Sequence, residues 1–294
     1  MRLKIENIDL SSNSGPNSFA SKLSLYIEEH GVRLISNQAD AYLCFIESER
    51  KKYDAPMYQR LDGIYFNTSQ NYNKKNSNIR RTYEMADGVI FQSKFNMLLT
   101  TKYFGEHKKS IIIHNGADLN AIQKVPEFGL NRYDNLWCCA SSWRPHKRLN
   151  ENIRYFLEHS GPNDGMIIAG SVPQNNRIND AKLHYVGVLS QSQLYSLYKK
   201  CKYFVHLAWL DHCPNVVADA RACGCIIICS STGGTKEIAG DNAVVIREER
   251  WDFEPVDLYK PPPLDFTKKC SIGLDSILDM SKTSKSYKEY IFGA

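Results

Sequence analysis

Long hydrophobic runs are missing from this sequence. No stretch approaches the roughly 20 apolar residues that a helix needs to cross a bilayer, and the amino terminus, MRLKIENIDLSSNSG, has no apolar segment of signal-peptide length. The nine cysteines are odd in number and irregular in spacing, which does not suit a framework of disulfides. We therefore expect a soluble, cytoplasmic protein in a reducing compartment.

Strong charge and the common nucleotide motifs are lacking as well. The formal net charge of +5 is mild and spread out, so it fits an anionic small ligand and does not require nucleic acid. Neither a GxGxxG fingerprint nor a Walker motif follows the first strand, which argues against a dinucleotide dehydrogenase. Cys223, Cys225 and Cys229 resemble metal ligands at first, but no histidine cluster lies near them, and buried small hydrophobes are the better interpretation.

What the sequence does contain is an alternation of apolar strands and helices. With 294 residues, 43% of them hydrophobic, the chain is long enough for two domains with cores of their own. In the first half we predict strands at 3–10, 41–48, 56–66, 88–93 and 110–116. Helices are predicted at 18–31, 79–86 and 94–105, with a polar loop at 67–78.

A polar linker at 119–133 separates this half from a second series of the same kind. Strands are predicted at 136–141, 165–171, 182–188, 203–209, 225–230 and 243–246, and helices at 149–160, 190–201 and 214–223. The tail contains a proline spacer at 261–263 and weak helical spacing over 271–290. Repeated strand–helix units predict parallel sheets covered on both faces, and therefore two facing, doubly wound α/β domains.

Two carboxylates flank a predicted helix start in the stretch DHCPNVVAD. The free amides around Pro214, Asn215 and Val216 are expected to form an anion site, strengthened by the helix dipole. Asp219, one turn into the helix, is placed to accept hydrogen bonds from two neighbouring hydroxyls, as on a ribose. Asp211, before the helix, is placed to hold hydroxyls beyond the phosphates. The alternative is that both are ordinary helix-start charges favoured by the dipole.

A basic loop follows the first strand of the second series. The stretch ASSWRPHKRL carries Arg144, Lys147 and Arg148 beside His146. Two cations on one turn at the end of a strand suit a diphosphate, whose charge must be neutralised. A solvated basic loop is the alternative.

Two loops of the first half also follow strands, where ligands of open parallel sheets bind. In SGPNSF, Gly15 allows the backbone to approach a ligand closely. In QRLDG, Arg60 and Asp62 end a strand, and Asp62 is a candidate base or hydroxyl anchor; a turn-forming Asp-Gly pair is the alternative.

Together these motifs resemble the nucleotide-sugar glycosyltransferases of the GT-B fold, family 4 type. That family carries two glutamates separated by seven residues, and the pair here resembles it with aspartates, each shorter by one methylene. ARACGCIIICSSTGGTKEI is similar to the family's EAxAxGxPVIxSxxGGxxEI. ASSWRPHKRL is similar to its donor-diphosphate loop, and HYVGVLS to the strand and loop that meet the nucleobase. The resemblance covers roughly residues 10–240, and its second half is the more specific.

The resemblance implies a GT-B fold and transfer of a sugar from a nucleotide-diphosphate donor to a saccharide hydroxyl, with retention of configuration. It implies domains at 1–130 and 131–262 and a tail, 263–294, that returns to the first domain. The expected catalytic residues are Asp62, Arg144, Lys147 and Asp211. The expected donor-binding residues are Gly15, Ser142, Gly187, Val188, Pro214, Asn215, Val216 and Asp219. The expected acceptor-binding residues are Arg60, Asn17, Ser93 and Asn115. No metal or cofactor is expected.

Two departures from the family pattern leave other functions open, namely the two aspartates in place of glutamates and a missing histidine in the first half. Many relatives place a histidine where this chain has QRLDG, and Asp62 is the candidate for its role. A nucleotide-sugar epimerase or hydrolase on the same fold is one alternative, and a catalytically silent nucleotide-sugar-binding protein is another. The pair of cations Arg144 and Lys147 argues against the silent protein, which has less need of them. No large basic amphipathic helix occurs in the first half, so at most peripheral membrane contact is expected. The sequence does not specify the oligomeric state.

Overall fold

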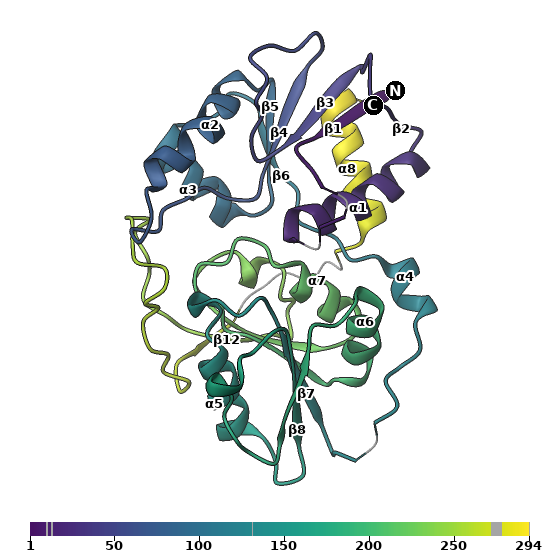
Figure 1. Ribbon diagram of the computed structural model, residues 1–294. Helices are drawn as coiled ribbons and strands as arrows, with labels where there is room; N and C mark the ends of the chain where they lie inside the picture. Colours follow the sequence, from purple (N-terminus) through teal and green to yellow (C-terminus); the bar gives the residue numbers. More distant parts are fainter. Residues whose placement is uncertain (10, 13, 131, 272–277, 294) are drawn as a thin grey trace.

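The computed structural model describes residues 1–9, 11–12, 14–130, 132–271 and 278–293. Its chain forms two α/β domains, one above the other in Figure 1. The first contains a six-stranded sheet in the order β2-β1-β3-β4-β5-β6, and the second a seven-stranded sheet in the order β13-β12-β11-β10-β7-β8-β9. The predicted pair of facing, doubly wound domains is confirmed.

The first domain is built on a wholly parallel sheet. Its strands are β1 (Arg2–Glu6), β2 (Arg33–Leu34), β3 (Ala41–Phe45), β4 (Met57–Leu61), β5 (Gly88–Phe91) and β6 (Ser110–Ile112). Its helices are α1 (Gly15–Glu29), α2 (Tyr72–Met85), α3 (Lys94–Phe104) and the carboxyl-terminal α8 (Met280–Phe292). Alternate side chains of each strand point to opposite faces. Leu43 therefore packs in a core with α1 and α8, while Tyr42 packs in a second core with α2 and α3.

The second domain repeats this plan with one difference. Its strands are β7 (Leu136–Ala140), β8 (Gly165–Ala169), β9 (Leu183–Gly187), β10 (Tyr203–His206), β11 (Ile226–Ser230), β12 (Val244–Ile246) and β13 (Lys269–Cys270). Its helices are α5 (Leu149–His159), α6 (Gln191–Lys200) and α7 (Asn215–Ala222), with 3₁₀ turns η1 (Pro145–Lys147), η2 (Gln174–Asn176) and η3 (Thr235–Glu237). The short β13, which was not predicted, pairs antiparallel with β12 at the edge of the sheet.

Besides the two-residue strands β2 and β13, which were not predicted, three segments differ from the expected secondary structure. The loop predicted at 67–78 is wrong from Tyr72 onward, because the Asn71 side chain accepts a hydrogen bond from the Lys74 amide and begins α2 early. The linker contains a short helix, α4 (Leu119–Lys124), which Asp118 caps in the same way. Of the weak tail helix, residues 272–277 lie outside the described residues, and α8 begins at Met280.

The chain crosses between the domains more than once. Residues 251–258, which we call the strap, leave the second domain and contact the first at the left of Figure 1. There Trp251 packs on Phe66 with ring centroids 4.8 Å apart, and Lys102 forms an ion pair with Glu254 at 2.5 Å. The chain then returns to the core around α5 before α8 closes against α1, which confirms the predicted return of the last helix. The exact domain limits stay a prediction.

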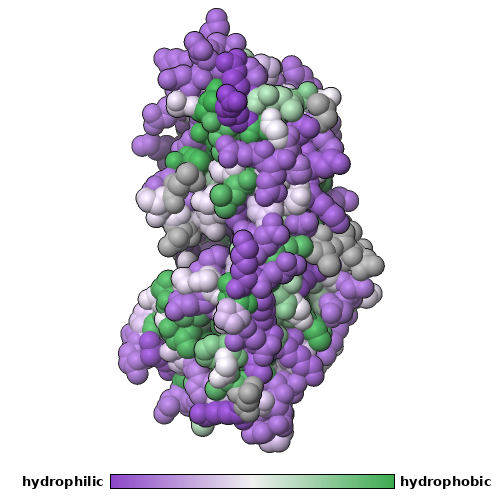
Figure 2. Space-filling model, turned by 90° about the vertical axis from the view of Figure 1, so that its right-hand side faces the viewer, coloured by the Kyte–Doolittle hydropathy of each residue, from purple (hydrophilic) through white to green (hydrophobic). Residues whose placement is uncertain are grey.

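The side of the molecule in Figure 2 shows the two domains stacked, with hydrophobic residues in small groups among hydrophilic ones. Within the part of the chain that the structure describes, no helix is long and apolar enough to cross a membrane.

Candidate functional site

Predicted site residues of both domains meet at the interface between the sheets. Asn115, just after β6, donates hydrogen bonds to the Cys213 carbonyl at 3.1 Å and to Asn215 Oδ1 at 2.9 Å. Asn215 in turn donates to the Gly15 carbonyl at 2.9 Å. The carboxyl ends of the two parallel sheets therefore face each other, as expected for ligand-binding edges.

Asp211 lies in the loop after β10 and is held by two basic side chains. Its Oδ2 accepts hydrogen bonds from Lys147 Nζ at 2.5 Å and interacts with His206 Nε2 at 2.9 Å. Burial alone would raise the pKa of Asp211, but the Lys147 ammonium and the His206 ring lower it well below its ordinary value. Asp211 is therefore a fixed anion at neutral pH. Sequence reasoning missed His206, which lies at the end of an apolar strand and was interpreted as part of the core.

The three cations of the basic loop have three different surroundings. Lys147, in η1, points to Asp211. Arg148 is fully buried and pairs with Glu248 at 2.7 Å, so it fixes the second domain internally. Arg144 is exposed and lines an open pocket of about 690 Å³ together with Trp143. Only Arg144 and Lys147 remain as candidates to meet a diphosphate, which are the two that the resemblance implies.

The start of α7 has no side-chain cap among the described residues. Pro214 occupies the cap position. The first amides, at Asn215 and Val216, therefore lack a side-chain acceptor of the kind that Asp118 provides for α4. Uncapped amides at the positive end of a helix dipole favour an anion such as a phosphate.

Asp219 is buried where α7 meets the first domain. Its side chain is 3% exposed, with Oδ1 3.1 Å from Lys22 Nζ and Oδ2 2.9 Å from Gln191 Nε2. Burial raises the pKa of Asp219, and Lys22 opposes part of that effect. Sequence reasoning missed Lys22. The available signal was its place on the buried face of α1, between Phe19 and Tyr26 in the helical spacing.

Arg60 and Asp62 form the centre of the first-domain side. Arg60 is fully buried and donates to Asp62, to Tyr287 Oη at 3.0 Å and to Asn115 Oδ1 at 2.7 Å. In this arrangement Arg60 contacts protein on every side, so direct contact with an acceptor would require it to move. Burial raises the pKa of Asp62, although Arg60 opposes the shift. Among the described residues, Asp62 Oδ2 has no hydrogen-bond partner.

Glu237, in the 3₁₀ turn after β11, joins the two domains directly. Its carboxylate accepts hydrogen bonds from the amides of Lys94 at 2.7 Å and Phe95 at 2.8 Å, the first residues of α3. It thus caps a helix of the opposite domain. Gly234 permits this approach, because a Cβ there would lie 2.7 Å from Oγ of Ser93, the residue that precedes α3. The sequence motif STGGTKEI indicated the glycines but not this contact.

The remaining predicted residues lie around this centre in varied surroundings. Asn17 Oδ1 accepts from the Asp9 amide at 3.1 Å, and buried Ser93 caps α3. Ser142 is exposed in the basic loop. Gly187, with φ of +72°, ends β9, and the next residue, Val188, is 78% exposed. Val188 thus leaves apolar surface exposed at this strand end, and its contact with a nucleobase stays a prediction.

Acid is expected to destabilise the folded chain through His212. Its ring lies between Gly63 and Phe95, and burial lowers the pKa of His212 from 6.5 to about 4. As the pH falls below 6.5, the unfolded chain binds a proton that the folded chain does not. The free energy of unfolding therefore falls, by up to about 1.4 kcal/mol per pH unit from this group.

Urea unfolding between pH 7 and pH 5 measures this effect. His212→Gln should show a shallower pH dependence than the wild type, and His159→Gln, at the end of α5, serves as the control. Equal slopes for the wild type and His212→Gln would contradict the assignment.

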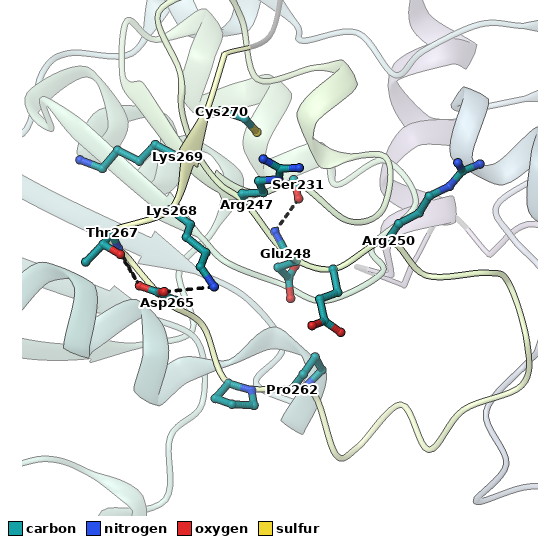
Figure 3. A pocket seen from close by; sticks show the side chains of 12 residues that line it. Ser231, Arg247, Glu248, Arg250, Pro262, Asp265, Thr267, Lys268, Lys269 and Cys270 are labelled. Carbon is teal, nitrogen blue, oxygen red and sulfur yellow. Dashed lines mark hydrogen bonds and ion pairs between the residues drawn. The ribbon is translucent and has the colours of Figure 1, made fainter.

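Other features of the structure do not point to a second site. An open pocket of about 1080 Å³ lies beside β12 and β13 (Figure 3), and none of the predicted site residues lines it. Its charges are partly paired within the protein, because Lys268 pairs with Asp265 at 3.4 Å and the Glu248 carboxylate pairs with Arg148 at 2.7 Å. Within the described ranges, no group of three or more His, Cys, Asp or Glu residues is arranged to hold a metal ion. The absence of a metal requirement stays a prediction.

Comparisons with known proteins agree with this geometry. Residues 123–252 match the sequence profile of the family described as "Glycosyl transferases group 1", whereas no curated protein matches. Sucrose-phosphate synthase from Thermosynechococcus elongatus superimposes with a TM-score of 0.65 at 12% identity, over 85% of this chain and 86% of that one. Anabaena HepE in complex with UDP and glucose gives 0.61 at 14% identity, over 99% and 95%. AviGT4, a glycosyltransferase involved in avilamycin A biosynthesis, gives 0.63 at 10% identity, over 98% and 96%.

At these identities the structural likeness establishes the fold, and the sequence profile matches residues 123–252, which are less than half of the chain. The resemblance predicted from the sequence is thereby confirmed, while the family 4 assignment stays a prediction. This chain has the fold of the GT-B glycosyltransferases, and its residues 123–252 match the family described as "Glycosyl transferases group 1".

Proposed function

We propose that this chain is a retaining glycosyltransferase that moves a sugar from a nucleotide-diphosphate donor to a saccharide hydroxyl in the cytoplasm. The observation that carries the proposal is the pairing of Lys147 Nζ with Asp211 at 2.5 Å, beside the uncapped start of α7. Lys147, Asp211 and the free amides of α7 lie after the ends of neighbouring strands. Together they suit a ligand that has both phosphates and hydroxyls. HepE, which has this fold, binds UDP and glucose.

Cleavage of the bond between sugar and diphosphate leaves negative charge on the diphosphate. In the proposed reaction the amides at Asn215 and Val216 and the cations Lys147 and Arg144 stabilise that charge. Such groups act most strongly when they are fixed before the reaction, and Lys147 is fixed by its ion pair. These protein groups supply the positive charge that the leaving group needs, so we propose that neither a metal nor a cofactor takes part.

The sugar and the nucleoside need groups that accept hydrogen bonds from hydroxyls. Asp211 stays ionised because of Lys147 and His206, and in the proposed complex it accepts from hydroxyls of the donor sugar. Asp219 accepts from the ribose. Asp62, with Oδ2 unpartnered among the described residues, takes the role of the histidine that relatives carry at this strand end. Retention and the saccharide nature of the acceptor rest on the resemblance stated above.

A donor screen tests the proposal. UDP-, GDP-, ADP- and TDP-sugars are added in turn, thermal shifts are recorded, and the donors that stabilise the protein are tested for nucleotide release with and without saccharides. We expect one nucleotide class to stabilise the protein and saccharides to stimulate release. Release that no saccharide stimulates would favour the epimerase or hydrolase, and binding without release would favour the silent protein. No shift with any donor would overturn the proposal.

A further inference from the structure

The turn that begins α7 is held from the opposite domain. Asn115, which lies in the loop after β6 and is 2% exposed, donates through Nδ2 to the Cys213 carbonyl at 3.1 Å and to Asn215 Oδ1 at 2.9 Å. These two acceptors lie on either side of Pro214, the cap residue of α7. One side chain of the first domain therefore contacts both ends of the turn that presents the free amides of the proposed diphosphate site.

The partners of the Asn115 carboxamide fix its orientation. Arg60 has only donors, so the Asn115 atom that it contacts at 2.7 Å is the oxygen Oδ1. The Cys213 carbonyl is only an acceptor, so it faces the nitrogen. A longer contact from Nδ2, at 3.2 Å, goes to Gln92 Oε1 within the first domain. A reversed carboxamide would leave these buried groups without partners, so Asn115 holds one orientation.

Asn115 is also firmly anchored in its own domain. Arg60, which holds the Asn115 oxygen, is fully buried and donates to Tyr287 of α8. Gly116, the next residue, packs on the backbone of Asp279, where a Cβ would lie 2.7 Å from the Asp279 carbonyl carbon. The loop after β6 is therefore fixed by α8, and it can serve as a support for a group in the other domain.

The Asn215 side chain completes the link between the domains. Its Oδ1 accepts from Asn115, and its Nδ2 donates to the Gly15 carbonyl at 2.9 Å. Both polar atoms of this carboxamide are engaged by the first domain, whereas the phosphate is proposed to meet the Asn215 backbone amide. The position of that amide therefore depends on how the first domain lies against the second. Groups that stabilise charge act most strongly when they are fixed in advance.

We propose that Asn115 is a positioning residue of the donor site, which fixes residues 213–215 across the domain interface and so raises the affinity for nucleoside diphosphates. This inference rests on the proposed function, because the diphosphate is that of the proposed donor. Asn115 acts through the turn and does not contact the donor itself. Donor affinity accordingly depends on a side chain of the first domain, although the amides that bind the diphosphate belong to the second.

The test uses the nucleoside diphosphate, among UDP, ADP and GDP, that binds the wild type. Its dissociation constant, measured by isothermal titration calorimetry, should rise about tenfold in Asn115→Ala, because two hydrogen bonds that hold the turn are lost. Asn76→Ala is the matched control. Asn76 is also buried in the first domain and exchanges two hydrogen bonds with the Tyr65 backbone, at 2.8 and 2.6 Å, so its loss lowers stability without releasing the turn. A wild-type constant in folded Asn115→Ala, or an equal rise in Asn76→Ala, would overturn the proposal.

A second variant reaches the same link from the other side. Asn215→Ala keeps the backbone amide and removes the side chain that Asn115 holds, so the dissociation constant should rise about threefold or more. This arm needs no change at Asn115, and an unchanged constant would contradict the proposal. In Asn115→Ala/Asn215→Ala the rise should be smaller than the product of the two single rises, because both residues act on one turn. A rise equal to that product would mean that Asn115 acts independently of the turn. Failure of UDP, ADP and GDP to bind the wild type would instead overturn the proposed function.

Discussion

Replacement of Asp211 by asparagine is expected to lower turnover about 100- to 1000-fold, the usual effect of removing one fixed electrostatic group from an active site. The variant keeps the shape of the side chain and loses the charge that Lys147 and His206 hold in place. The donor diphosphate is bound mainly elsewhere, by the amides of α7, so donor affinity should change far less. Steady-state rates with the donor found in the screen, together with titration calorimetry, separate the two effects.

Lys147→Ala is the matched comparison. It removes the diphosphate cation as well as the partner of Asp211, so both donor affinity and turnover should fall. Thermal unfolding of both variants shows whether each is folded at the assay temperature. Wild-type turnover in folded Asp211→Asn would mean that Asp211 has a structural role only, and wild-type donor affinity in Lys147→Ala would exclude Lys147 from the diphosphate site.

Replacement of Arg60 by methionine is expected to lower the free energy of unfolding by about 3–5 kcal/mol, the usual cost of breaking a buried ion pair from one side. The guanidinium is fully buried, and its loss leaves the Asp62 carboxylate without its cation. It also removes the bond to Tyr287, through which Arg60 holds α8 to the sheet. Urea unfolding measures the change.

Two further variants show whether the loss of stability in Arg60→Met comes from the buried ion pair. Arg80→Met removes a surface arginine whose pair with Glu84 is about half exposed on both sides, and it should change stability by less than about 1 kcal/mol. The double variant Arg60→Met/Asp62→Asn should recover part of the loss, because no uncompensated charge remains. If the double variant is no more stable than Arg60→Met, the stability does not depend on the ion pair.

The sequence predicted those parts of the structure that depend on local pattern. Apolar runs such as LWCCA and GMIIA gave the strands, and the loops after them gave Asp211, Lys147 and the start of α7. Lys22 and Glu237 could not be assigned in the same way, because each acts on a residue more than a hundred positions away in the opposite domain. Only the packing of the domains brings such groups together.

Predictions from local sequence pattern were also wrong where polar residues form a helix or are buried in the folded protein. The lysines and asparagines of residues 67–78 indicated a loop, yet Asn71 begins a helix there. Arg60 was expected to face an acceptor because it ends a strand. It is instead enclosed by side chains from the loops after β4 and β6 and from α8, which lies more than two hundred residues further along the chain.

The strap connects the domains on the side opposite the linker that contains α4 (Figure 1), whereas the chain enters α8 beside that linker, where Ala117 pairs with Asp279. The linker and the strap lie at opposite edges of the interface between the domains, so the line that joins them can act as an axis of rotation. The domains can rotate slightly about this axis. A wide opening around the linker alone would break the aromatic contacts of Trp251 and Phe253 with Phe95. Access to the donor site is therefore expected through a small rocking motion of one domain against the other, while the strap stays in place.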